Sequence, residues 1–308
     1  MTDICLLGSG ATMPTPERGL SAAILRCEGR AILFDCGEGT QCALRRRHFS
    51  PVKIDLIALS HYHGDHIFGL PGLLQTMSCM ERQSPLYITG PEGLRQAMEP
   101  VMSLAGVQCY DIVLLCGDSI SLSELHRAWP AGAQLSPIPA RHRIAAQGYR
   151  FFLPRPPKFD PDRAKALGVP VAEWKGLIAR PDSFVTVDGR EVYGHELLGK
   201  ARRGISVVFS GDTMPCPEME NAARDADLLI HEATYGDDAD VDQAITYGHS
   251  TFRQAAELAA RAGARRLWLT HFSQMLRCPE DYMGFAAAFP GAVCGHDGLE
   301  ISLSFGEI

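Results

Sequence analysis

The segment Ser60–His66 limits what this chain can fold into more than any other, because three histidines and an aspartate lie within it. The apolar run Ile54–Leu59 before it predicts a buried strand that leads directly into the cluster. His61 and His63 alternate, so both can point to one side of an extended turn, and Gly64 permits a tight bend after them. A histidine-rich surface loop is the alternative, but buried packing does not account for so many polar groups at a strand end. The sequence therefore predicts a metal-binding turn with four candidate ligands: His61, His63, Asp65 and His66.

Three further candidates lie elsewhere in the chain. His142, Asp212 and His271 each directly follow a short apolar run that is typical of a strand. Taken alone, His142 or His271 is more often an ordinary histidine than a ligand. Together with the first cluster they supply the ligands that a pair of metal ions needs, with Asp212 able to bridge both ions. The sequence therefore indicates a hydrolase with two metal ions.

The composition is that of an ordinary globular protein. The 308 residues are 46% hydrophobic and 21% charged, which allows one large domain or two small ones with a substantial core. No apolar run approaches the roughly 18 residues that span a bilayer, and the first residues are typical of a strand rather than a signal peptide. The ten cysteines form no CxxC pair, so we expect buried, reduced thiols, as at Cys5, Cys27 and Cys116, in a cytoplasmic protein.

Charge is distributed unevenly along the chain. The formal net charge is −7, which argues weakly against nucleic-acid binding. Between Arg141 and Arg203, however, 13 basic and 7 acidic residues give a local positive charge, whereas the remainder has 16 basic and 29 acidic residues. Such a segment on an acidic body is either a footprint for phosphate groups or a solvated insertion that is basic by chance.

Apolar runs and turn residues predict the elements around the candidate ligands. We expect strands at 4–7, 22–27, 31–35, 54–59, 205–210, 228–230, 267–269 and 299–305, and helices at 39–48, 70–80, 91–104 and 250–262. Glu28-Gly29-Arg30 predicts a hairpin turn, and Ser250 or Thr251 is expected to cap the last helix. Residues 154–203 contain six prolines and few sustained apolar runs, so we expect an extended protrusion there rather than core.

Several motifs resemble those of metallo-β-lactamase-fold hydrolases, and specifically those of the ribonuclease Z family of tRNA 3′-processing endonucleases. The HxHxDH pattern in Ser60–His66 is shared by the whole superfamily, whereas Phe34–Gln41, His231–Thr234 and His249–Thr251 are more specific. The matching segments are completed by Leu7–Thr15, Gly69–Leu74 and Ser210–Thr213. The resemblance therefore spans nearly the whole chain.

The resemblance implies an α/β fold, a four-layer αβ/βα sandwich of two mixed sheets covered by helices, with the metals at one sheet edge. It implies one domain over residues 1–308, in which residues 154–203 form an inserted basic arm that grips tRNA through its backbone and shape. Lys158–Asp160 and Ala164–Pro170 resemble that arm, although Ala172-Glu173 replaces the Gly-Pro expected there. A homodimer is also implied, in which one subunit's arm holds the tRNA that the other cuts.

The resemblance implies a role for each candidate residue. Two zinc ions per subunit, or Mn²⁺ in their place, would share seven ligands: His61, His63 and His142 for one ion, Asp65, His66 and His271 for the other, and Asp212 for both. Asp65 would also orient the attacking water as a base. His249 with Glu232 would contact the scissile phosphate and assist the leaving 3′-oxygen, whereas His231 would be structural. The expected reaction is zinc-dependent removal of the 3′ trailer from precursor tRNA, leaving a 3′-hydroxyl.

Two other functions remain open at this stage. A related phosphodiesterase or sulfatase that acts on small esters would share the metals but would have no use for the basic arm. A non-catalytic RNA-binding subunit would have a degenerate site, whereas all seven candidate ligands are present here. A β-lactamase is disfavoured by Asp35–Gly39 and by the large basic insertion.

Overall fold

The computed structural model describes residues 1–306, and the chain divides into two compact units. The larger unit, called the body below, consists of Met1–Leu153 together with the chain from Ile205 onward. The smaller unit, called the arm, is Pro154–Gly204. The candidate ligands all belong to the body.

The first of the two large sheets of the body contains the strand that leads into the histidine cluster. Its strands lie in the order β16-β1-β2-β3-β4-β5-β6. Their bounds are β1 Thr2–Gly8, β2 Ala22–Cys27, β3 Arg30–Phe34, β4 Ile54–Ala58, β5 Leu86–Thr89, β6 Ile112–Leu115 and β16 Glu300–Leu303. The strands β3 to β6 run parallel, so β4 reaches the cluster with its carboxyl end at the same edge as its parallel neighbours.

The expected hairpin turn joins β2 and β3. Glu28 and Gly29 both have positive φ angles, of 49° and 76°, which is the conformation that a tight two-residue hairpin requires. The strand bounds predicted from the sequence on either side of this turn are confirmed to within one residue.

The second large sheet carries the later candidate residues. Its strands lie in the order β15-β14-β13-β12-β9-β8-β7. Their bounds are β7 Ile120–Ser121, β8 Gln134–Pro139, β9 Gln147–Arg155, β12 Arg202–Phe209, β13 Leu228–Glu232, β14 Leu267–Thr270 and β15 Ala292–Cys294. The neighbours β12, β13, β14 and β15 are parallel, so their carboxyl ends meet at one edge. Asp212, Glu232 and His271 lie at that edge, at or just after those strand ends.

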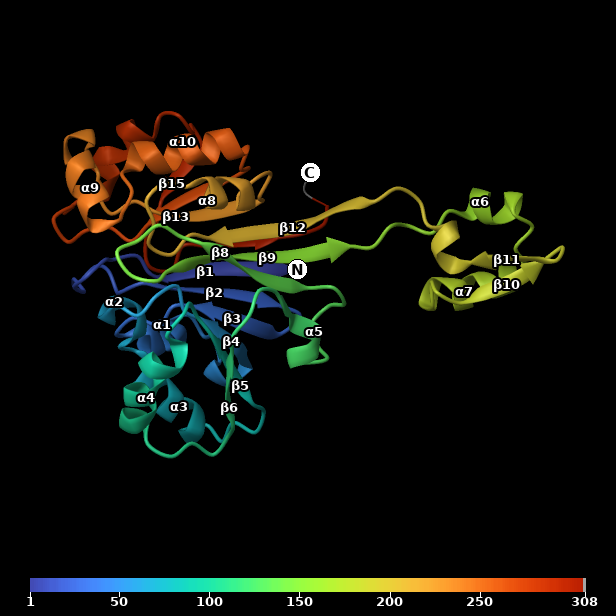
Figure 1. Ribbon diagram of the computed structural model, residues 1–308, viewed down its shortest axis with the longest axis horizontal. Helices are drawn as coiled ribbons and strands as arrows, with labels where there is room; N and C mark the ends of the chain where they lie inside the picture. Colours follow the sequence, from blue (N-terminus) through green and yellow to red (C-terminus); the bar gives the residue numbers. More distant parts are fainter. Residues whose placement is uncertain (307–308) are drawn as a thin grey trace. The chain divides into compact units, whose positions relative to one another are not determined.

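Helices cover the outer face of each sheet, as Figure 1 shows, so the body has four layers. One helical layer packs against the first sheet through a core that includes Leu33, Leu73 and Met98, and another packs against the second sheet through Val208 and Leu258. The helices of the body are α1 Thr40–Arg46, α2 Gly64–Ile67, α3 Leu70–Cys79, α4 Leu94–Ala105, α5 Leu122–Leu125, α8 Pro217–Ala222, α9 Val241–Tyr247 and α10 Phe252–Ala262, with 3₁₀ turns η1 Pro51–Lys53, η3 Asp238–Asp240 and η4 Pro279–Ala286. The expected four-layer sandwich is confirmed.

A third core lies between the two sheets and contains Phe34, Phe151 and Phe209 among its buried side chains. Into it the body places a buried ion pair: Arg30 donates to both oxygens of Asp55, and Trp129 Nε1 donates to Asp55 Oδ2 over 2.8 Å. Three segments that are distant in sequence are therefore joined in the interior by one carboxylate.

The arm has a small core of its own. Its elements are α6 Pro161–Ala166, α7 Val171–Ala179, the antiparallel hairpin of β10 Phe184–Val187 and β11 Arg190–Tyr193, and η2 Gly194–Leu197. Five buried side chains pack together within it: Ala164, Val169, Leu177, Val192 and Leu197. The sequence analysis predicted an extended protrusion over residues 154–203, and the arm has nearly these bounds. The small core within it was not predicted, because it forms only where short apolar segments of the helices and the hairpin combine.

The cysteines depart in part from expectation. All ten are free, and Cys5 and Cys27 are buried as predicted. Five of the ten are exposed, which contradicts the expectation of buried thiols; among them is Cys116, which follows β6 at the edge of the first sheet. Among residues 1–306, no helix is both long and apolar enough to cross a membrane.

Candidate metal centre

The candidate ligands come together at the ends of four strands of the body. The Ser60–His66 turn follows β4, His142 follows β8, Asp212 follows β12 and His271 follows β14. The bends at these strand ends need unusual backbone: His271 has a φ of 59°, and Gly211 next to Asp212 has a φ of 58°. A side chain at Gly211 would collide with Ser60, so glycine permits the close approach of the two sheets at the site.

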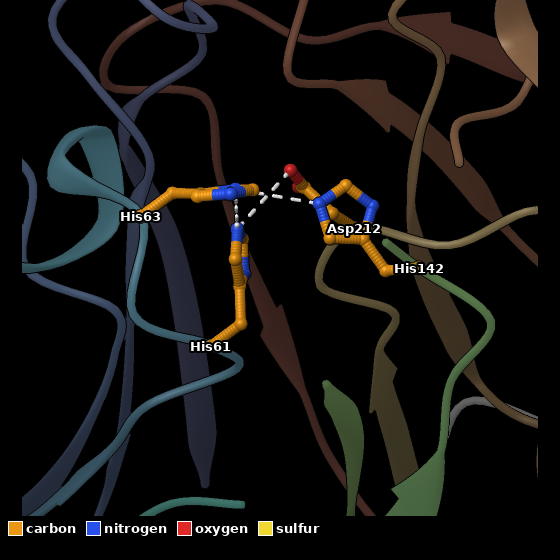
Figure 2. Close-up of side chains that lie close together, drawn as sticks. All are labelled: His61, His63, His142 and Asp212. Carbon is orange, nitrogen blue, oxygen red and sulfur yellow. Dashed lines mark hydrogen bonds and ion pairs between the residues drawn. The ribbon is translucent and has the colours of Figure 1, made fainter. Parts of the chain in front are cut away.

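The first ligand group is His61, His63, His142 and Asp212, whose side chains converge on a common point in Figure 2. His61 Nε2 lies 2.9 Å from His63 Nδ1, which in turn lies 3.3 Å from His142 Nε2. Asp212 Oδ2 lies 3.6 Å from His61 Nε2. These residues come from three separate segments, yet their donor atoms are as close as ligands of one ion.

The second group consists of Asp65, His66 and His271. His66 Nε2 lies 3.1 Å from His271 Nε2, and Asp65 Oδ2 lies 3.6 and 3.4 Å from these two atoms. Asp212 also reaches this group, since its oxygens lie 3.4 Å from both His66 Nε2 and His271 Nε2. The carboxylate of Asp212 thus lies between the two groups, as the bridging role predicted from the sequence requires.

Hydrogen bonds at the Nδ1 atoms fix the tautomers of four of these histidines. His66 Nδ1 donates to Asp35 Oδ2 over 2.7 Å, and His142 Nδ1 donates to the carbonyl of Gly248 over 2.8 Å. Because Ser60 Oγ and Thr234 Oγ1 donate to carboxylates, they accept from the Nδ1 atoms of His61 and His271. In each case the unprotonated Nε2 is left facing the ligand group, as metal-binding histidines require.

Two features show that this donor set suits cations. His66 Nε2 and His271 Nε2 lie 3.1 Å apart, and the Nδ1 atom of each ring is already hydrogen-bonded on the side away from the ligand group. Asp212 is buried, and within residues 1–306 no group donates a hydrogen bond to its Oδ1 atom. An unsatisfied buried carboxylate oxygen is costly unless a cation lies beside it. Imidazole nitrogens and carboxylate oxygens are ligands that Zn²⁺ and similar divalent metals accept.

A second polar cluster, His249 with Glu232, adjoins the ligands. Glu232 Oε1 accepts from His249 Nδ1 over 2.9 Å and from the backbone N–H of Thr213 over 3.0 Å. Its Oε2 accepts from the backbone and hydroxyl of Thr234 and from the backbone of Ser250. The carboxylate is thereby held rigidly, and it directs His249 toward Asp212, whose Oδ2 is 3.9 Å from His249 Nδ1.

The histidines and carboxylates of the site differ in the direction in which their surroundings shift the pKa. Burial favours the neutral form of His249, but the adjacent Glu232 carboxylate outweighs it and raises the pKa of His249 to about 9. Burial also lowers the pKa of His61 and His63, which keeps their imidazoles neutral. Burial favours the neutral form of Asp65, but the adjacent imidazoles of His271 and His66 outweigh it and lower the pKa of Asp65. The site thus combines the neutral imidazoles of His61 and His63 with ionised carboxylates and with His249, which Glu232 keeps protonated.

The residues that orient the ligands were not predicted from the sequence. Asp35 accepts from Ser60 N, Ser60 Oγ and His66 Nδ1, and its φ of 55° is strained for a residue other than glycine. Asp35 and Thr234 both lie in segments that matched family motifs, so the signal was present but no role was assigned. The carbonyl of Gly248 leaves no such signal, because any residue supplies a carbonyl. His231 is buried outside the ligand groups, which agrees with a structural role.

The ligand atoms face a pocket of about 610 Å³ that His63, Asp65, Asp212 and His249 help to line.

A family model described as "Beta-lactamase superfamily domain" matches residues 184–272, and one described as "Anti-Pycsar protein Apyc1" matches residues 2–102. The solved structure of the human tRNase Z, short form, resembles the chain with a TM-score of 0.67 and 29% identity, covering 98% of this chain and 99% of that one. Fold and site together define a metal-dependent hydrolase of the metallo-β-lactamase superfamily.

Curated relatives narrow this class further. The ribonuclease Z of Clostridium tetani is 39% identical over 99% of both chains, and that of Lachnospira eligens is 35% identical over all of this chain and 99% of its own. The chain belongs to the ribonuclease Z family. The resemblance noted in the sequence is thereby confirmed.

Proposed function

We propose that this protein is an endoribonuclease that removes the 3′ trailer from tRNA precursors and leaves a 3′-hydroxyl on the tRNA. The observation that carries the proposal is the convergence of seven ligand side chains in two groups that share Asp212. Support comes from relatives over the full length that are named ribonuclease Z, and from the likeness to human tRNase Z. A function on small esters alone has no comparable support.

We further propose that the two groups hold two zinc ions, with Mn²⁺ as an acceptable substitute. His61, His63 and His142 would hold one ion and Asp65, His66 and His271 the other, with Asp212 shared. When bound, two divalent cations would make a water molecule more acidic and would neutralise the charge that develops on the phosphate oxygens.

In the proposed reaction, the protein side chains orient the water and move the protons. Asp65 is ionised and is held by the backbone N–H of Thr12, which donates to its Oδ2 over 2.7 Å, so it can accept a proton from the attacking water. His249 donates a hydrogen bond from Nδ1 to Glu232 and, because its raised pKa keeps it protonated, carries a second proton on Nε2. As the water oxygen bonds to phosphorus and the bond to the 3′-oxygen breaks, His249 would protonate that oxygen. The products are a 3′-hydroxyl on the tRNA and a 5′-phosphate on the trailer.

We propose that the arm binds the tRNA backbone away from the cleavage site. Lys158, Arg163 and Lys165 are exposed on it and are suited to contact phosphates without reading sequence. We also propose a homodimer in which each arm serves the partner's site. The free thiols fit the reducing cytoplasm, where we place the activity.

The test is to map the cleavage of a 5′-labelled precursor tRNA and to measure the metal content of the same preparation. We expect about two zinc or manganese ions per subunit and a product that ends in a 3′-hydroxyl at the discriminator base. Asp65→Ala should nearly abolish this cleavage while leaving the thermal unfolding temperature close to that of the wild type. A metal-free protein, or a wild-type enzyme that cleaves a small chromogenic phosphodiester but no precursor tRNA, would contradict the proposal.

A further inference from the structure

Two exposed aromatic side chains border the metal pocket. Phe68 is 70% exposed and Tyr247 is 46% exposed, and both line the same pocket as Asp65 and His249. Phe68 directly follows α2 on the side of the first sheet, whereas Tyr247 ends α9 on the side of the second sheet. Each of the two sheet-and-helix halves of the body therefore contributes one aromatic ring to the pocket.

Both rings are held by the segments that carry the ligands. The Phe68 ring lies against Gly64, where a side chain on residue 64 would collide with it, so the ring is fixed to the turn that carries Asp65. The guanidinium of Arg143 lies 5.5 Å from the centroid of the Tyr247 ring, within the range of a cation–π contact. The residue after Tyr247, Gly248, provides the carbonyl that orients His142. Both exposed rings therefore lie against segments that carry metal ligands.

Positive charge accompanies the second ring. Of the basic residues between Arg141 and Arg203, Arg141 and Arg143 lie in the body on either side of His142 and are exposed. Arg143 also lines the metal pocket, together with Tyr247. Aromatic rings beside an arginine at a phosphodiester-cleaving site are suited to unpaired nucleotides, because rings stack on bases of any sequence and arginine pairs with phosphate.

We propose that Phe68 and Tyr247 stack on the bases of the two nucleotides that flank the cleaved bond, and that Arg143 binds an adjacent phosphate. This inference rests on the proposed function and adds how the single-stranded end is held. Tyr247 lies two residues before His249, which would protonate the 3′-oxygen, so Tyr247 takes the last base of the tRNA body. Phe68 lies beside Asp65 on the water-activating side and takes the first base of the trailer.

The experiment pairs Phe68→Leu with a precursor tRNA whose first trailer nucleotide is abasic. On the intact precursor, Phe68→Leu should lower kcat/KM by about 5- to 100-fold, the range expected for loss of one stacked base. On the abasic precursor, the wild type and Phe68→Leu should agree within about two-fold, because neither can stack there. Tyr247→Leu should show the same dependence on an abasic last nucleotide of the tRNA body.

Three controls keep the result interpretable. Phe68→Tyr retains a ring and should keep kcat/KM near the wild-type value, and Leu104→Ala, an exposed apolar position in α4, should change nothing. Metal content should be equal in all variants. Equal losses on intact and abasic RNA, or loss of metal in Phe68→Leu, would overturn the stacking proposal while leaving the proposed function in place. A wild-type enzyme that cuts no precursor would remove both.

Discussion

At the scale of single residues, the metal centre depends as much on the groups behind the histidines as on the histidines themselves. Asp35 is fully buried and accepts from His66 Nδ1 and from Ser60, which in turn accepts from His61 Nδ1. One carboxylate therefore orients ligands of both groups. Removal of the Asp35 carboxylate should therefore weaken metal binding, although Asp35 is not itself a ligand.

Replacement of Asp35 by asparagine is expected to weaken zinc binding by about 10- to 100-fold, because the single amide oxygen cannot accept from both Ser60 N and His66 Nδ1. Competition with a fluorescent chelator measures this affinity. Asp297→Asn is the matched control, since Asp297 also accepts from a serine backbone and hydroxyl, those of Ser9, but touches no ligand. Equal zinc affinity in wild type and Asp35→Asn would show that Asp35 does not orient the site.

The role of His249 can be separated from that of the ligands by measuring metal content and turnover together. His249→Ala should lower the cleavage rate of precursor tRNA by about 10²- to 10⁴-fold, the usual contribution of a general acid. Zinc content should remain that of the wild type, because no ligand is removed. Loss of zinc would instead make His249 a ligand, which its proximity to Asp212 and His271 also allows.

Which residues of the site could be predicted from the sequence depends on how specific each residue type is for metal binding. The seven expected ligands do come together in the structure. They could be predicted because histidines and aspartates that follow several strands have few roles besides metal binding. The acceptors at Nδ1 could not be found in the same way. An aspartate, a threonine and a backbone carbonyl have many uses, and only the folded geometry selects this one.

At the scale of elements, the site exists because parallel strands end at a common edge. The loops after β12, β13 and β14 carry Asp212, Thr234 and His271, and the turn after β4 meets them from the other sheet. The two sheets must therefore keep their relative position for the two ligand groups to share Asp212. The inter-sheet core and the buried Arg30–Asp55 pair within it maintain that position.

Asp55→Ala should lower the free energy of unfolding by about 3–5 kcal/mol, because it leaves Arg30 buried without its carboxylate. Urea denaturation followed by circular dichroism provides the measurement. Glu220→Ala, which removes the partner of Arg261 on the surface, should cost less than about 1 kcal/mol. Similar losses in the two variants would mean that the buried pair contributes no more than a surface pair.

Elements were predicted where an apolar run is bounded by clear turn residues. The strands β2 and β4 and the helices α3 and α10 fall close to their expected bounds, and Thr251 caps α10 as expected. The elements of the arm were not predicted, because its helices and hairpin are short and each contributes only one buried side chain to the core of the arm. Periodicity over so few residues cannot be distinguished from chance.

At the scale of the whole molecule, the arm can be tested as an electrostatic binding surface. Changing Lys158, Arg163 and Lys165 to glutamate should weaken tRNA binding and flatten its dependence on salt, by about 0.7–0.9 in the log–log slope for each lost phosphate contact. Filter binding across a range of salt concentrations measures both. Turnover of a small phosphodiester should not change, and Arg265→Glu, an exposed charge on the body, should leave tRNA binding intact. A variant arm that binds tRNA with the wild-type salt dependence would contradict this role.

The proposed dimer makes a last prediction that depends on which subunit an arm serves. Asp65→Ala has a sound arm and a dead site, whereas the arm variant has a sound site and a weakened arm, so each homodimer alone should be inactive on precursor tRNA. If subunits exchange freely at equal concentrations, half of the dimers are mixed, and one of the two sites in each mixed dimer has both a working centre and a working partner arm. Activity should then recover to about a quarter of the wild-type value. If each arm instead serves its own subunit, no site in the mixture has both parts, and activity should stay at the level of the separate variants.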